Sequence, residues 1–294
     1  MTGIVLAVLA VLLSWAAPSA LARAHWVEHA PRAAVVLWQA LALAAVLAAV
    51  GAALAAPEEA LRAWAGEVEF GAGLLLAVGL AALLAGVIVL RLVWVSVWLG
   101  LRTRRRRARH AQLLHLLDTA DPQDRRMHVL AGPVPMAYCI PGRTHKVVLT
   151  DAALEVLDAD EVDAVIEHER AHLRARHDLV LEAFTALHAA FPRFVRSRVA
   201  LDAVHQLLEL LADDGAARHV GSRRLGSALG KLGGTAHSGP VQARRARLAA
   251  GAAGRRAPGR HAAGAYLSAV AVLALPTVVL VQPWLRAAMD AIGN

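Results

Sequence analysis

Two histidines with a glutamate beside the first form the stretch of this sequence best suited to chemistry. They lie in His168-Glu169-Arg170-Ala171-His172, which has the pattern H-E-x-x-H. Residues four apart lie on one face of a helix, so both imidazoles can reach a single metal ion. Zinc lowers the pKa of a bound water to about 7, and a neighbouring carboxylate can take its proton. We therefore expect His168 and His172 to bind zinc and Glu169 to act as the general base.

The residues that precede this motif predict the helix that carries it. Asp158 is suited to be the N-cap, and Glu161 is placed to reach back to the backbone of Asp158, as in a capping box. Val162, Val165 and Ile166 then follow at helical spacing. The motif should therefore lie in the middle of a helix with an apolar face.

A zinc site of this kind needs a third protein ligand, and Glu209 is the best candidate. It lies in the apolar run 207–213, where an unpaired carboxylate is costly to bury. Asp213 lies on the same helical face and can accept the outer N–H of a zinc-bound histidine. The alternative is that Glu209 lies on the solvent-exposed face of an amphipathic helix. Three other carboxylates are the fallback ligands: Glu182, Asp202 and Asp214.

These segments resemble the BlaR/MecR membrane metallopeptidases, with the HtpX/CAAX endopeptidases as close relatives. The resemblance rests on H-E-R-A-H-L-R-A-R-H-D at 168–178 and on E-L-L-A-D at 209–213. The segments 135–139 and 146–150 also resemble the region before the motif in that family. The similar part spans about residues 125–218.

This resemblance implies a zincin-type domain of mainly α (α+β) structure that hydrolyses peptide bonds. The same roles are implied for five residues: zinc ligands His168, His172 and Glu209, general base Glu169, and Asp213 as the partner of a ligating histidine. The implied substrate is a BlaI/MecI-like transcriptional repressor. Quality-control proteolysis of the HtpX type and a non-catalytic membrane scaffold are the alternatives. No S-x-x-K or K-T-G motif occurs, so the resemblance does not extend to direct β-lactam sensing.

The composition predicts a multi-pass α-helical membrane protein. The 57% hydrophobic content and the mean hydropathy of +0.49 exceed those of ordinary soluble enzymes. Four apolar runs are each long enough to cross a hydrocarbon core of about 30 Å. They cover about residues 4–21, 33–56, 71–100 and 262–284. No Lys or Arg precedes the first run, so a retained span is favoured over a cleaved secretory signal.

The expected organisation follows from these runs and from the changes in composition between them. Residues 1–100 should hold three spans, and 101–220 the metallopeptidase domain. Residues 221–261, rich in Gly, Ala, Ser and Arg, should form a basic flexible connector. Residues 262–294 should hold the fourth span and a short tail. Arg91 should mark the point where the third span leaves the hydrocarbon and its side chain snorkels to the interface.

Loop charges predict the orientation in the plasma membrane. Residues 57–70 carry four glutamates and one arginine, whereas 102–109 carry six arginines, and 215–261 carry ten Lys or Arg and no acid. Residues 101–261 should therefore be cytoplasmic, with both termini outside. Attraction to anionic lipid explains the net charge of +8, so we expect the lipid bilayer, and no nucleic acid, to be the direct contact. The pattern does not predict an oligomeric state.

Three short strands are expected near 127–130, 136–140 and 146–150. One strand of the hairpin should hold the backbone of the substrate by strand addition. Cys139 is read as a small strand residue, with a cysteine nucleophile as the alternative. His177 lies about 140° around a continuous helix from His172, so it should not face the same metal; we expect it to support the site or to end the helix.

Overall fold

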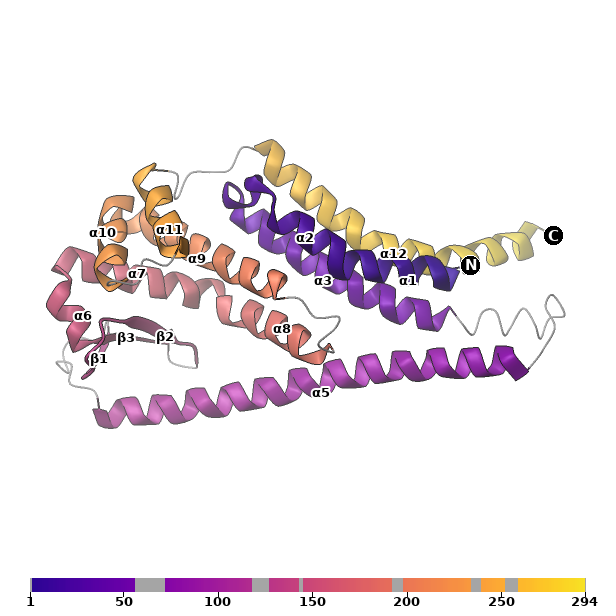
Figure 1. The fold of residues 1–294 in the computed structure, drawn as a ribbon, viewed down its shortest axis with the longest axis horizontal. Helices are drawn as coiled ribbons and strands as arrows, with labels where there is room; N and C mark the ends of the chain where they lie inside the picture. The colour runs from indigo at the N-terminus through magenta and orange to yellow at the C-terminus, as the bar shows by residue number, and fades with distance from the viewer. Residues whose placement is uncertain are drawn as a thin grey trace.

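The computed structural model describes residues 2–55, 72–117, 127–142, 145–191, 198–233, 239–251 and 259–293. Figure 1 shows a group of long helices toward one end and a smaller unit of helices and strands toward the other. Helix α5 runs along one side of both groups. The expected loop 57–70 lies outside the described residues.

The helices of the apolar group pack on one another through small residues. Helix α3 packs against both α1 and α12, and Ala44 and Ala48 of α3 are fully buried. A Cβ atom at Gly51 of α3 would lie only 3.3 Å from the side chain of Leu6 and 3.7 Å from that of Leu280, so this glycine leaves room for both leucines. The elements of this group are α1 (Thr2–Val11), the π-helix η1 (Leu12–Ala16), α2 (Ala17–Ala22), the short 3₁₀ helix η2 (His25–Glu28), α3 (Pro31–Leu54) and α12 (Gly259–Gly293).

Helix α5 (Ala72–Leu117) joins the two groups without interruption. Its 46 residues correspond to a length of about 69 Å. The domain boundary expected at residue 100 therefore falls inside one continuous helix. Many of the apolar side chains in its first two-thirds are exposed, Leu90 and Trp94 among them, which is typical of a surface that meets lipid or a partner.

Four helices of the described residues are long and apolar enough to cross a membrane, judged by length and composition. Their candidate spans are Thr2–Ala22, Pro31–Ala53, Leu83–Leu114 and Gly259–Gln282. Three of these helices agree within a few residues with the apolar runs 4–21, 33–56 and 262–284. The fourth, Leu83–Leu114, overlaps the expected span 71–100 but lies further along the chain.

Arg91 of α5 donates a hydrogen bond to the carbonyl oxygen of Ala190. Ala190 is the last residue of helix α8 (His177–Ala190). The guanidinium therefore lies at the negative end of that helix, where a cation is favourable. Arg91 therefore has a specific partner in the fold, and its place at the edge of the hydrocarbon stays a prediction.

The three expected strands are confirmed and form one sheet. They are β1 (His128–Leu130), β2 (Ala137–Ile140) and β3 (Lys146–Thr150), in the order β1-β3-β2. β3 pairs in parallel with β1 and antiparallel with β2. All five residues of the central strand β3 are buried. β2 is thus an edge strand within this sheet.

Helix α7 (Ala159–Ala175) confirms the predicted capping box and apolar face. The backbone N–H of Asp158 donates to the Glu161 carboxylate at 2.9 Å, and Val165 and Ile166 are buried. The helix ends at Arg176, which has a left-handed backbone with φ of 53°. Helix α8 begins at the next residue. The short α6 (Asp151–Val156) precedes α7, and α9 (Val199–Val220) follows α8.

The segment expected to be a flexible connector is instead partly folded. Residues 222–232 and 239–249 form helices α10 (Ser222–Leu232) and α11 (Gly239–Ala249). Leu225 and Leu248 are almost fully buried, in a cluster with Ala164 of α7 and Ala216 of α9. A few well-spaced leucines thus anchor both helices although Gly, Ala and Arg dominate their composition. The folded unit therefore extends beyond residue 220. Residues 234–238 and 252–258 of the expected connector lie outside the described residues.

Candidate metallopeptidase site

Helices α7 and α9 carry the candidate metal ligands and lie unusually close together. Gly215 of α9 faces Ala171, the residue before His172. A Cβ atom at Gly215 would lie only 2.8 Å from the Cβ of Ala171. The absence of a side chain at this glycine therefore allows the approach that brings Glu209 up to the two histidines.

His168, His172 and Glu209 place their ligand atoms around one point. The two Nε2 atoms lie 3.2 Å apart. Glu209 Oε2 lies 3.6 Å from His168 Nε2, and Glu209 Oε1 lies 3.4 Å from His172 Nε2. Ligand atoms on a tetrahedral zinc are about 3.3 Å apart, given bonds of about 2.0–2.1 Å. This cluster therefore has the donor types and spacing of a catalytic zinc site.

The outer nitrogen of each histidine also meets a side chain. Nδ1 of His168 lies 3.1 Å from Oδ1 of Asp213, whose side chain is 1% exposed. Nδ1 of His172 lies 2.9 Å from Nδ1 of His177. Such contacts orient ligating imidazoles and tune their basicity.

His177 reaches the site because helix α7 has already ended. The 140° separation assumed a continuous helix, but the left-handed Arg176 breaks it and α8 starts afresh at His177. The buried His177 ring lies edge-on to His172, with centroids 4.9 Å apart. As expected, His177 is not among the clustered ligands; it supports His172 instead.

Glu169 lies beside the cluster, with Cys139 of β2 as a neighbour. Burial raises the pKa of Glu169 above its usual value, although the charge of His168 and a hydrogen bond with Cys139 oppose this. A general base works best when its pKa approaches the working pH. Burial, with the charge of Glu169, raises the pKa of the Cys139 thiol to about 12. The thiol thus stays protonated, which argues against a cysteine nucleophile.

Arg244 is a site residue that the sequence interpretation missed. Its Nη1 donates to Glu209 at 2.7 Å, and its Nε and Nη2 donate to the two oxygens of Asp213 at 2.8 and 2.6 Å. It comes from α11, in the segment expected to be a connector. The available signal was indirect: two carboxylates four residues apart in an apolar helix call for a cation.

The surroundings of these groups set their charges. Burial alone would raise the pKa of Glu209, but His168 and Arg244 together lower it to about 2. Burial would lower the pKa of His168, but Asp213 and Glu209 raise it to about 9. A metal ion takes the place of that proton, so protonation of His168 and metal binding compete.

The three fallback ligands lie elsewhere in the fold. Glu182 pairs with Arg107 at 2.7 Å, and Asp214 pairs with Arg247 at 2.7 Å. Asp202 is exposed in the first turn of α9. None of the three belongs to the metal cluster.

A cleft of about 770 Å³ opens in front of the cluster. The edge strand β2 forms one side, next to Glu169, and the basic end of α5 forms another. Three contacts join α5 to the other walls. Arg107 pairs with Asp178 and Glu182 of α8 at 3.0 and 2.7 Å, and His110 lies 2.8 Å from the Tyr138 hydroxyl. The cleft therefore offers an extended peptide both a strand edge and the candidate metal centre.

Residues 103–208 match the model of peptidase family M48. The match supports a metallopeptidase of the M48 family, whose members are zinc-dependent hydrolases of peptide bonds. The matched part runs from the basic end of α5 through the H-E-x-x-H helix and stops one residue before Glu209. No curated protein matches the chain, and no solved structure matches it. The M48 match does not single out the BlaR/MecR type.

Proposed function

We propose that this chain is a membrane-embedded zinc endopeptidase whose active site faces the cytoplasm. The observation that carries the proposal is the cluster of His168, His172 and Glu209, with Glu169 beside it in an open cleft. Zinc at such a cluster supplies Lewis acidity and makes water a nucleophile near neutral pH.

The side chains around the cluster have separate roles in this proposal. Glu169 accepts the proton of the attacking water and delivers it to the leaving nitrogen. His177 and Asp213 hold the imidazoles of His172 and His168, while Arg244 holds Glu209 in place. The substrate backbone pairs with the edge strand β2, which is next to Glu169.

We propose regulatory proteolysis of a BlaI/MecI-like cytoplasmic repressor as the biological role. The order of apolar and basic segments supports the cytoplasmic orientation, and the resemblance at 168–178 and 209–213 supports the substrate. Quality-control proteolysis of membrane proteins is the second candidate, because the matching model is that of M48 as a whole. A single repressor substrate would favour the first role, and cleavage of many misfolded membrane proteins would favour the second.

The decisive experiment compares wild type with Glu169→Gln, purified in lipid nanodiscs. The variant keeps the shape of the side chain and removes its ability to accept a proton. We expect one zinc per chain in both proteins, measured by elemental analysis. Peptide hydrolysis should fall by about 100- to 10,000-fold in the variant.

Two results would count against this function. Equal hydrolysis by wild type and variant would remove Glu169 from the mechanism. A zinc-free, inactive wild-type protein would support the scaffold alternative.

In cells, the repressor should disappear with wild type and persist with Glu169→Gln at equal expression.

A further inference from the structure

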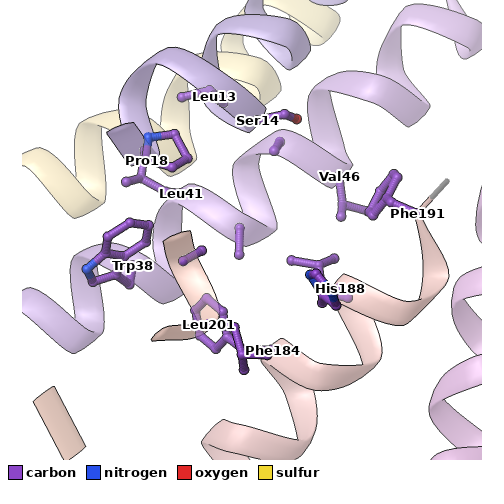
Figure 2. A pocket seen from close by; sticks show the side chains of 14 residues that line it. Leu13, Ser14, Pro18, Trp38, Leu41, Val46, Phe184, His188, Phe191 and Leu201 are labelled. Atoms are coloured by element: carbon purple, nitrogen blue, oxygen red, sulfur yellow. The ribbon is translucent and has the colours of Figure 1, made fainter. Parts of the chain in front are cut away.

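A second cavity, away from the metal cluster, lies where the apolar helices meet the metallopeptidase unit. Its volume is about 90 Å³, several times the roughly 10–15 Å³ that one water requires on this measure. Helices η1 and α3 form one wall, and α8 and α9 form the other (Figure 2). The cavity is partly open to the surface of the protein.

The lining of this cavity is suited to a hydrocarbon. Most of the lining side chains are aliphatic or aromatic, as Leu41, Phe184 and Leu201 illustrate in Figure 2. Ser14, His188 and the indole of Trp38 are the polar exceptions among them. A polar ligand would lose its hydrogen bonds with water here and regain few of them.

The wall formed by η1 departs from regular helix geometry. Leu12–Ala16 is a π-helix, closed by a hydrogen bond from the backbone N–H of Ala17 to the carbonyl of Leu12. Leu13 and Ser14, inside this wide turn, both line the cavity. π-turns are rare and occur frequently at functional sites.

We propose that this cavity binds one acyl chain of a bilayer lipid. The inference rests on the membrane location in the proposed function. Thr2–Ala22 and Pro31–Ala53 are candidate spans, and their outward side chains Leu12, Trp15, Leu43 and Leu47 are exposed. In a bilayer these side chains meet lipid tails, so acyl chains surround the cavity at high concentration.

The position of the cavity connects the bound lipid to the metal site. Helix α8 starts at His177, in contact with His172, and ends at the cavity with Leu187, His188 and the following Phe191. Helix α9 starts at the cavity and carries Glu209 about 12 Å further along its axis. An acyl chain therefore fills a gap against the two helices that support the metal site, and it stabilises their packing.

The test uses the full-length protein in vesicles that contain a phosphatidylcholine with a photoreactive diazirine in the middle of one acyl chain. After illumination, mass spectrometry locates the labelled residues. Ala45→Phe, on the cavity wall of α3, adds a ring that fills the space. Leu43→Phe adds the same ring on an exposed position of the same helix, outside the cavity lining.

We expect wild type to be labelled on cavity residues of α3 and α8. This labelling should fall about tenfold in Ala45→Phe, which corresponds to about 1.4 kcal/mol. It should be unchanged in Leu43→Phe. Labelling of only the outward side chains in wild type would mean ordinary boundary lipid and would overturn the inference without any variant. Recovery of the protein in the aqueous phase would instead overturn the membrane location itself.

Discussion

At the scale of single residues, Glu209 is an ionised carboxylate whose oxygens lie close to three nitrogen-bearing side chains. His168, His172 and Arg244 surround it, and its pKa of about 2 keeps it charged across the physiological range. An anionic oxygen beside two imidazoles suits a zinc ion that must remain bound during turnover.

Glu209→Gln should strongly reduce zinc retention, because the amide is a neutral and much weaker ligand. Elemental analysis after dialysis against a mild chelator measures this loss. Glu182→Gln is the matched control, since Glu182 pairs with Arg107 instead of joining the cluster. Full zinc occupancy in Glu209→Gln would exclude Glu209 as a ligand.

At the scale of elements, the distance between α7 and α9 sets the geometry of the site. Gly215→Ala would place a methyl group 2.8 Å from the Cβ of Ala171 and force the two helices apart. We expect destabilisation of about 1–3 kcal/mol, seen as a lower melting temperature, together with weaker zinc binding. Gly226→Ala is the control, because a Cβ there meets Leu248 at an ordinary 3.7 Å. Equal melting temperatures for the two variants would contradict the close approach.

Helix α10 is attached to the start of α7 by an ion pair that depends on pH. Lys231 Nζ lies 2.6 Å from Glu161. Burial alone would raise the pKa of Glu161, but hydrogen bonds from Lys231 and Ser227 lower it below its usual 4.5. A lowered carboxylate pKa stabilises the fold above pH 4.5, and this stabilisation is lost as the pH falls through the lower, folded value.

Lys231→Met should therefore lower the melting temperature at pH 7, and the difference from wild type should shrink below pH 4. Thermal unfolding of both proteins over this range measures the effect. Arg223→Met, on an exposed position of the same helix, serves as the control. A difference that stays constant with pH would show that packing, and not the ion pair, holds α10.

At the scale of the whole molecule, one continuous helix links a candidate span to the catalytic cleft. The apolar part of α5 carries exposed side chains, and its basic end forms a wall of the cleft through Arg107 and His110. A movement of the apolar part of such a helix can be transmitted directly to the substrate site. This arrangement would suit a peptidase whose activity is regulated from the membrane.

The proposed orientation predicts opposite labelling of two positions in a Cys139→Ser background. Glu58→Cys should react with an impermeant maleimide in intact cells, because the proposed orientation puts loop 57–70 outside. Arg223→Cys should react only after lysis, because the proposed orientation places α10 in the cytoplasm. The reverse pattern would overturn both the orientation and the cytoplasmic substrate.

The sequence by itself determined the features that depend on local pattern. The capping box at Asp158, the helix that carries H-E-x-x-H, the three strands and the four long apolar helices all follow from periodicity or run length over neighbouring residues. Glu209 was nominated because a carboxylate in an apolar run needs a partner, and the structure brings it to the two histidines.

Only the tertiary structure decided how distant segments meet. Arg244 comes from a region whose composition suggested a tether, and no local pattern distinguishes it from its neighbour Arg245. His177 faces His172 because the left-handed backbone at Arg176 ends α7 and lets α8 start in a new direction. The cavity between α3 and α8 joins residues more than a hundred positions apart. Such contacts depend on packing between distant parts of the chain, and no repeating pattern of neighbouring residues predicts that packing.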